Sequence, residues 1–127
     1  MKVEISNGEL LDKLSILELK LLKVKDEVKI TNIKKEFETL NPLRKVLFEQ
    51  NDSELHNLYL ELSRVNSILW DIEDAIRDYE REKRFNKEFV KLARSVYITN
   101  DKRSKIKKEI NTLTGSNLTE EKSYEQY

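Results

Sequence analysis

Apolar side chains recur at helical spacing along most of the chain. The longest repeat advances in steps of three and four residues through four heptads, with Leu55, Leu58, Leu62, Val65, Leu69, Ile72, Ile76 and Tyr79 in register. A second repeat has the same rhythm and contains Phe89, Leu92, Val96, Thr99, Arg103, Ile106, Ile110 and Leu113. This spacing predicts two α-helices, over residues 52–84 and 86–114. Because the link between them is short, they are expected to fold back as a long antiparallel hairpin.

The N-terminal region carries a wider apolar face. Ser6 and Glu9 have the spacing of a helix N-terminal capping pair, and leucines and valines then recur as far as Val28. We expect a helix over residues 7–28. Its broad apolar face indicates that more than one neighbouring helix covers it.

Residues 30–50 are expected to form two short, broken helices. The phase of the apolar pattern changes after residue 29, and Pro42 follows Asn41. A proline disfavours the helical conformation of the residue before it and cannot donate the backbone hydrogen bond of a helix interior. The sequence therefore predicts a helix end at Asn41 and a new short helix that starts at Pro42.

The C-terminal region is expected to be less regular. Gly115 suits the end of the second hairpin helix, because glycine adopts the left-handed conformation at little cost. Residues 116–127 show no sustained period, so we expect a tail that Tyr124 and Tyr127 could hold against the body of the protein.

Composition agrees with a helical fold. A chain of 127 residues is long enough for one domain with a modest core. It has only 2 Gly and 1 Pro, and 38% of its residues are charged, a composition that favours long helices with few turns. The predicted fold is all-α: a helical bundle built on the long antiparallel hairpin, in a single domain over residues 1–115 that is followed by the tail 116–127.

Charge and cysteine content exclude several classes of function. Lys and Arg together number 24, as do Asp and Glu, so no summed field attracts nucleic acid or an acidic membrane surface. Without Cys there is no thiolate nucleophile, disulfide or Cys-based metal site. No stretch approaches the ~18 apolar residues of a membrane span, and the first residues lack the apolar core of a signal peptide. We expect a cytoplasmic protein that neither binds nucleic acid nor inserts into a membrane.

A polar interruption marks the second hairpin helix. Thr99 and Arg103 occupy two positions at which the repeat calls for apolar residues. In an antiparallel hairpin that turns at residue 85, Arg103 lies at the height of Asn66, and Thr99 lies near Trp70. One interpretation is a polar layer that fixes the pairing of the helices at some cost in stability. The other is an anion site, in which Arg103 and Lys107 receive a carboxylate or a phosphate. The sequence leaves both open.

Polar residues also line one side of each hairpin helix at steps of three and four residues. Together with the interruption they form a candidate ligand-binding set: Trp70, Asp74, Arg77, Arg94, Tyr97, Asn100, Asp101 and Arg103. Lateral packing with surface ion pairs explains the same pattern. The set contains no catalytic residue that the sequence identifies.

Metal or acid–base chemistry has weak support. Asp71 and Asp74, with Glu9 or Asp12 from the first helix, could hold a divalent cation. His56 is the only histidine and has no partner at a recognisable spacing, and there is no Gly-rich phosphate loop. We therefore expect neither a metal nor a cofactor.

Four blocks of sequence carry a family resemblance: GELLDKLSILELK, LWDIEDAIRDYE, ARSVYITNDKR and EEKSY. Together they resemble a small family of bacterial and phage proteins of unknown function. Some relatives are similar to domains encoded beside glycosyltransferase and surface-polysaccharide genes. The resemblance implies a context and no catalytic residue.

Three classes of function remain. The favoured one is a binding or adaptor module that acts through helix–helix contacts, accessory to polysaccharide assembly. Such a module would pair with another protein or with itself, because regular heptads on a thin hairpin leave apolar surface that one chain does not cover. The second class is a small enzyme that clamps an anionic metabolite with Arg77, Arg94 and Arg103, as in chorismate-mutase-like helices. The third is a nucleotide pyrophosphatase-like bundle that uses Mg²⁺.

Overall fold

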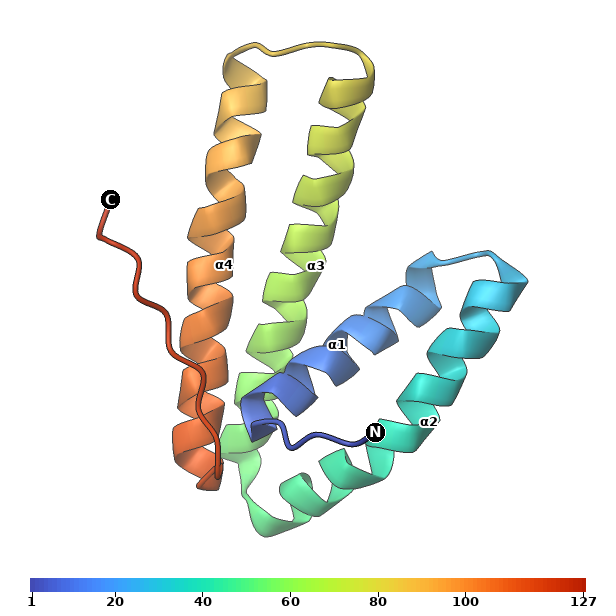
Figure 1. Ribbon diagram of the computed structural model, residues 1–127, viewed down its shortest axis with the longest axis vertical. Coiled ribbons are helices and arrows are strands. Elements are labelled where there is room, and N and C mark those ends of the chain that lie inside the picture. Colours follow the sequence, from blue (N-terminus) through green and yellow to red (C-terminus); the bar gives the residue numbers. More distant parts are fainter.

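The computed structural model describes residues 1–127 as four helices without strands, α1 (Asn7–Lys23), α2 (Glu27–Gln50), α3 (Ser53–Arg81) and α4 (Lys87–Thr114). Figure 1 shows α3 and α4 as a long antiparallel hairpin, with α1 crossing its lower half and α2 running back beside α1. The prediction of an all-α bundle built on this hairpin is confirmed. No helix combines the length and the apolar character that crossing a lipid bilayer requires.

The hairpin ends are set by capping residues. Asp52 caps α3 by accepting a hydrogen bond from the Glu54 backbone N–H at 3.0 Å. Asn86 caps α4 through the Phe89 N–H, at 3.1 Å. Gly115 ends α4 in the left-handed conformation, with φ of 63°, as the sequence predicts.

The predicted helix 7–28 is too long. α1 ends at Lys23, and Val24 is extended. Asp26 then caps α2 by accepting a hydrogen bond from the Lys29 N–H at 3.0 Å. The chain turns before the phase of the apolar pattern changes, because the Asp26 side chain satisfies a backbone donor at the start of a new helix.

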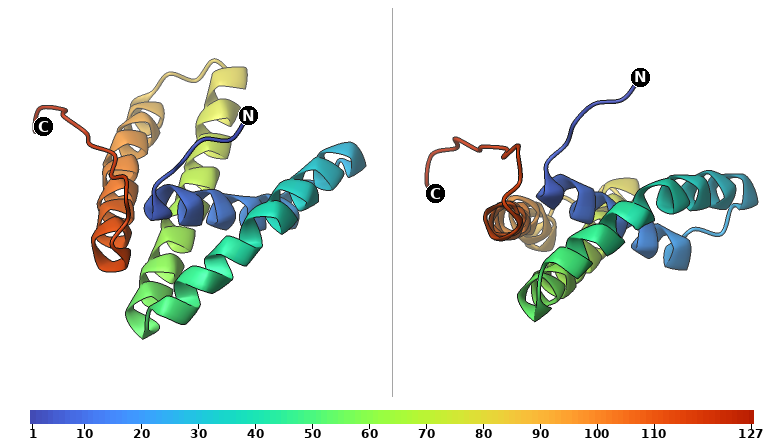
Figure 2. Two further views of the ribbon diagram at one scale, coloured as in Figure 1. Left: turned by 60° about the horizontal axis from the view of Figure 1, so that its bottom comes forward. Right: turned by 90° about the horizontal axis from the view of Figure 1, so that it is seen from below.

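The predicted break at Asn41–Pro42 is wrong. α2 runs without interruption from Glu27 to Gln50 and contains Pro42 in its interior. Figure 2 shows that α2 bends along its length, which is how a helix accommodates a proline that cannot donate a backbone hydrogen bond. Packing of Phe37, Leu40, Leu47 and Phe48 against the core holds both halves of the helix in place.

The core lies where α1 crosses the lower half of the hairpin. Its fully or largely buried apolar side chains come from α1, α3 and α4 and are Leu10, Leu11, Leu14, Leu55, Tyr59, Leu62, Ile106 and Ile110. Further along, α3 has no buried residue after Leu69, and α4 has none before Thr99. The upper half of the hairpin therefore projects beyond the core (Figure 1).

Candidate functional site

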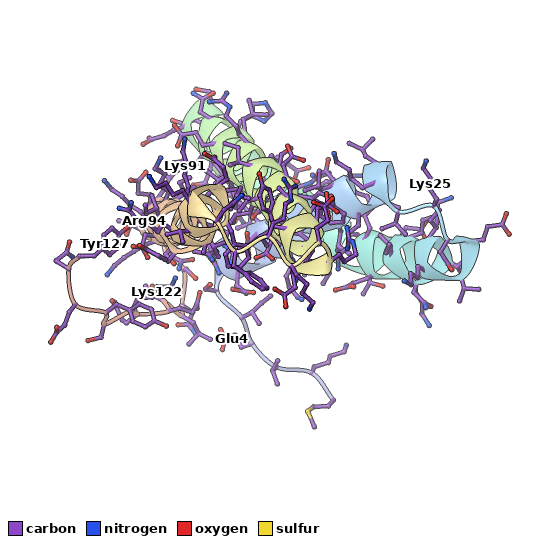
Figure 3. The ribbon with its side chains drawn as sticks, turned by 90° about the horizontal axis from the view of Figure 1, so that it is seen from above. Glu4, Lys25, Lys91, Arg94, Lys122 and Tyr127 are labelled. Atoms are coloured by element: carbon purple, nitrogen blue, oxygen red, sulfur yellow. The ribbon has the colours of Figure 1, made fainter.

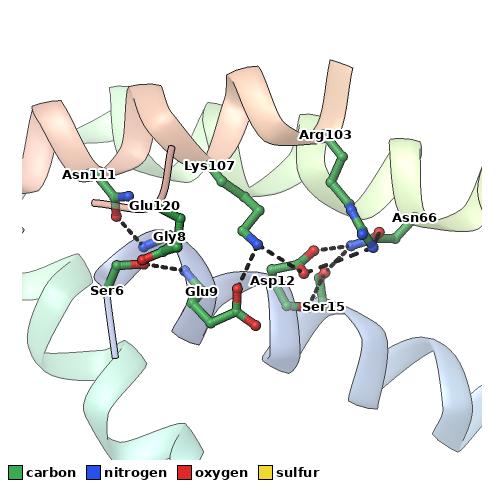
Figure 4. Close-up of polar contacts among 10 residues, drawn as sticks. All are labelled: Ser6, Gly8, Glu9, Asp12, Ser15, Asn66, Arg103, Lys107, Asn111 and Glu120. Carbon is green, nitrogen blue, oxygen red and sulfur yellow. Dashed lines mark hydrogen bonds and ion pairs between the residues drawn. The ribbon is translucent and has the colours of Figure 1, made fainter. Parts of the chain in front are cut away.

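A buried polar cluster joins α1 to the hairpin (Figure 4). The Asn66 amide donates hydrogen bonds to Asp12 Oδ1 at 2.9 Å and to Ser15 Oγ at 2.7 Å, and all three residues are buried. Burial of a carboxylate is costly unless hydrogen bonds and positive charge compensate it. The Asn66 amide therefore supplies the hydrogen bond that the buried Asp12 carboxylate needs where α1 crosses α3.

Two cations of α4 complete this cluster from the other side. Lys107 Nζ lies 2.6 Å from Glu9 Oε2 and 3.8 Å from Asp12 Oδ2. Arg103 Nη1 lies 4.0 Å from Asp12 Oδ2, and its one hydrogen bond, to Asn66 Oδ1, is 3.5 Å long. Both Arg103 distances are at the limit for such interactions. Since a guanidinium has five N–H donors, most of those of Arg103 have no protein partner.

Arg103 also lines a cleft of about 460 Å³ between α1, α3 and α4. Five residues of the candidate ligand-binding set meet there: Trp70, Asp74, Arg77, Asn100 and Arg103. Ile16, Leu19 and Leu69 supply apolar wall. The hairpin geometry brings these residues together because each lies on the side of its helix that faces α1.

The polar groups of the cleft differ in how they are paired. The Arg77 guanidinium forms an ion pair with Glu73 one turn away on α3. Asp74 and Asn100 make no side-chain hydrogen bond or ion pair within the chain, and the Trp70 indole N–H has no acceptor. The cleft thus offers a carboxylate, an amide and an indole beside a loosely held guanidinium.

The remaining predicted residues lie elsewhere. Tyr97 and Asp101 line a second cleft of about 340 Å³ under the C-terminal segment. The Tyr127 hydroxyl donates a hydrogen bond to Asp101 Oδ2 at 2.8 Å, and the Tyr127 ring packs edge-on against Tyr97. The hydrogen bond to Asp101 raises the pKa of Tyr127. Asn100 lines both clefts, so the two adjoin.

Arg94 belongs to neither of these clefts. It is exposed and forms no ion pair. In the view from above (Figure 3), it lies beside α4 on the same side as Tyr127. The candidate residues on α4 therefore divide between two faces, with Arg103 in the first cleft and Arg94 on the side of Tyr127, and a clamp of Arg77, Arg94 and Arg103 is not formed.

The predicted carboxylates for a divalent cation are not brought together. Asp12 is held in the buried cluster, and the Asp71 Oδ1 atom lies 3.9 Å from Lys23 Nζ. No three His, Asp or Glu side chains gather closely enough to hold a metal ion. His56 is exposed, with its ring beside Phe48.

A hydrogen-bonded clasp of three helices lies outside the residues that the sequence pattern singles out. The Glu18 carboxylate on α1 accepts hydrogen bonds from the Arg44 guanidinium on α2 and the Tyr59 hydroxyl on α3. Arg44 also donates to the Tyr59 oxygen at 2.9 Å. Burial of the Tyr59 phenol and its hydrogen bond to Glu18 raise the pKa of Tyr59. The only signal for this clasp was a tyrosine beside the apolar repeat of α3, and its partners are too distant in sequence to be inferred.

Comparisons with known proteins add a family and no activity. No curated protein and no solved structure matches the chain. The model of a protein family described as "Family of unknown function (DUF6165)" matches residues 1–127. On this match over its whole length, the chain belongs to the DUF6165 family.

Proposed function

We propose that this protein is a non-catalytic binding module that acts through helix–helix contacts made by the free half of its hairpin. We call residues 70–98 the hairpin arm. One observation carries the proposal: no side chain of the arm is buried. The arm nevertheless keeps an apolar seam with Ile72, Ile76, Phe89 and Leu92, which stay half-exposed.

The contact between the two helices of the arm buries little apolar surface and therefore stabilises the arm only weakly. Isolated helices are marginal in water, and most helical stability in proteins comes from packing of an apolar face against a neighbour. On the arm, Phe85 is 57% exposed and Val90 is 54% exposed. A further helix laid along the arm would cover the seam and these side chains, so the arm is suited to docking helices.

The partner that fits the arm is a second copy of it. The α3 part of the arm, residues 70–81, has five acidic and two basic residues, whereas the α4 part, residues 87–98, has three basic and one acidic residue. A two-fold axis would place the acidic helix of one arm beside the basic helix of the other, which makes the surface self-complementary. We therefore propose that the protein self-associates through its arms.

Light scattering after size-exclusion chromatography tests this proposal. The wild-type protein is expected to have the molar mass of a dimer or a larger oligomer, and Val90→Glu is expected to be a monomer. Leu22→Glu is the matched control, because Leu22 is 84% exposed on α1, outside the arm. High salt is expected to weaken the association, since it screens the opposite charges. A monomeric wild type at the highest concentration the protein tolerates would contradict the proposal.

A further inference from the structure

We propose that the cleft lined by Trp70, Asp74, Asn100 and Arg103 binds a hydroxylated ring acid of the size of a hexuronate or a hexose phosphate. Trp70 and Asp74 lie at the base of the hairpin arm, on the side that faces α1, and the proposal does not depend on the arm-to-arm contact. It rests on unpaired polar groups, on their order along the cleft and on the net charge of the lining.

The acid group of the ligand would bind at Arg103. The Arg103 side chain is 30% exposed, and its guanidinium lies 4.0 Å from Asp12 Oδ2 and 3.5 Å from Asn66 Oδ1. These contacts hold the guanidinium in place and leave most of its N–H donors free for a ligand. Guanidinium groups bind carboxylates and phosphates through two parallel N–H···O bonds. A ligand oxyanion therefore replaces water at Arg103 without breaking a short protein contact.

The middle of the ligand would lie between Trp70 and Asn100. Trp70 is half-buried and lies one turn of α3 beyond Asn66, the residue that meets Arg103. An indole covers an apolar C–H face, and the free Asn100 amide both donates and accepts hydrogen bonds. A sugar-like ring presents this combination of an apolar face and a polar edge.

The far end of the cleft selects hydroxyl groups. The Asp74 carboxylate has no partner in the chain, and it accepts hydrogen bonds from hydroxyls but repels a second anionic group. Asp74 lies eight residues beyond Asn66 on α3, a rise of about 12 Å at 1.5 Å per residue. Acetate or a small amino acid is too short to reach from the Arg103 guanidinium to the Asp74 carboxylate. A six-membered ring with an acidic substituent is longer and fits this separation better.

The charge of the lining sets the charge of the ligand. Arg77 and Arg103 are balanced by Glu73 and Asp74, so the cleft has no excess positive charge. Polyanions such as nucleoside triphosphates are poorly matched to it. A single acid group with neutral hydroxyls is well matched.

Fluorescence of Trp70 tests the proposal directly, because it is the only Trp in the chain. Galacturonate and glucose 6-phosphate are titrated separately into the full-length protein, with glucose and acetate as probes that lack the acid or the ring. A saturable change is expected with at least one of the two ring acids and with neither glucose nor acetate. The ring acid that binds more tightly identifies a carboxylate or a phosphate as the acid group.

Variants show whether the signal comes from the proposed groups. Arg103→Gln is expected to weaken binding at least about tenfold, and Asp74→Asn, on an exposed residue, severalfold. Arg94→Gln is the matched control, an arginine of the same helix outside the cleft, and is expected to bind like the wild type. No saturable response to either ring acid up to about 10 mM would overturn the proposal. Equal weakening by Arg94→Gln and Arg103→Gln would also overturn it, as would binding that is unchanged in Asp74→Asn.

Discussion

At the scale of single residues, the polar core is organised around Asp12 and Asn66 rather than around Arg103. Asp12 and Asn66 are each 4% exposed and share a hydrogen bond of 2.9 Å, whereas both contacts of Arg103 are long. Removal of a partner from a buried carboxylate costs more than removal of a distant, partly solvated cation. The stabilising role of the polar layer therefore belongs to the pair on α1 and α3.

Two substitutions separate these roles. Asn66→Leu is expected to lower the free energy of unfolding by about 1–3 kcal/mol, because Asp12 loses its buried donor. Arg103→Leu is expected to change it by less than about 1 kcal/mol, because Lys107 remains near Asp12. Urea unfolding followed by circular dichroism measures both. If Arg103→Leu costs as much as Asn66→Leu, Arg103 is instead the centre of the cluster.

Gly8 is a second residue whose role depends on a close contact. A Cβ atom at this position would lie 2.5 Å from the Lys107 carbonyl oxygen, and the Gly8 N–H donates to Asn111 Oδ1 at 2.6 Å. Gly8→Ala is expected to lower the melting temperature by several degrees, for a cost of about 1–3 kcal/mol. In an uncrowded helix the same change would stabilise, so a raised melting temperature would show that α1 does not approach α4 this closely.

The sequence predicts some of these contacts and not others, for a physical reason. The height of Arg103 opposite Asn66 follows from helix geometry alone, and the structure places the two side chains in contact. Asp12, Ser15 and Gly8 could not be assigned partners, because the angle at which α1 crosses the hairpin depends on packing of the whole core. For the same reason the Glu9 carboxylate, expected to cap α1, instead pairs with Lys107.

At the scale of elements, α2 shows tertiary packing overriding local preference. Pro42 interrupts the backbone hydrogen bonds of a helix that Phe37, Leu40, Leu47 and Phe48 hold against the core. The local rule for proline predicts two pieces, and the structure has one bent helix. Packing on both sides of the proline is not visible in a local sequence window.

Replacement of the proline tests this account of α2. Pro42→Ala restores the missing N–H donor and is expected to raise the free energy of unfolding by about 1–3 kcal/mol. Lys45→Ala, on an exposed residue of the same helix, is expected to have little effect. A destabilised Pro42→Ala variant would show that the bend is needed, for example to place Arg44 in the clasp with Glu18 and Tyr59.

The clasp that joins α1, α2 and α3 predicts a dependence of stability on alkaline pH. The folded protein keeps the Tyr59 phenol neutral because its pKa is raised, whereas the unfolded chain ionises it near pH about 10. The contribution of this shift to stability is therefore full below pH about 10 and is lost as pH rises toward the raised pKa. Urea unfolding at increasing pH should show a smaller loss for Tyr59→Phe than for the wild type. Equal losses in the two proteins would contradict the role of Tyr59.

At the scale of the whole molecule, the protein divides into a small core and a hairpin arm that projects beyond it (Figure 1) and has no buried side chain. Heptad spacing was sufficient to predict the hairpin and its antiparallel direction. It was not sufficient to predict how much of the hairpin α1 would cover. Five residues of the candidate set share one cleft because α1 crosses near Asn66, and the same crossing leaves Arg94 outside it.

The arm carries the central claim, and cross-linking at a single position tests it most directly. The natural chain has no Cys, so one introduced cysteine reports on one site. With a bis-maleimide cross-linker, which bridges two thiols that are not in direct contact, Val90→Cys, on the arm, is expected to form a covalent dimer in high yield, and Leu22→Cys, which is more exposed and lies on α1, is expected to remain largely monomeric. Equal, low yields from both variants, with a monomeric molar mass for the wild type, would contradict the proposal that the arm docks helices of a second copy.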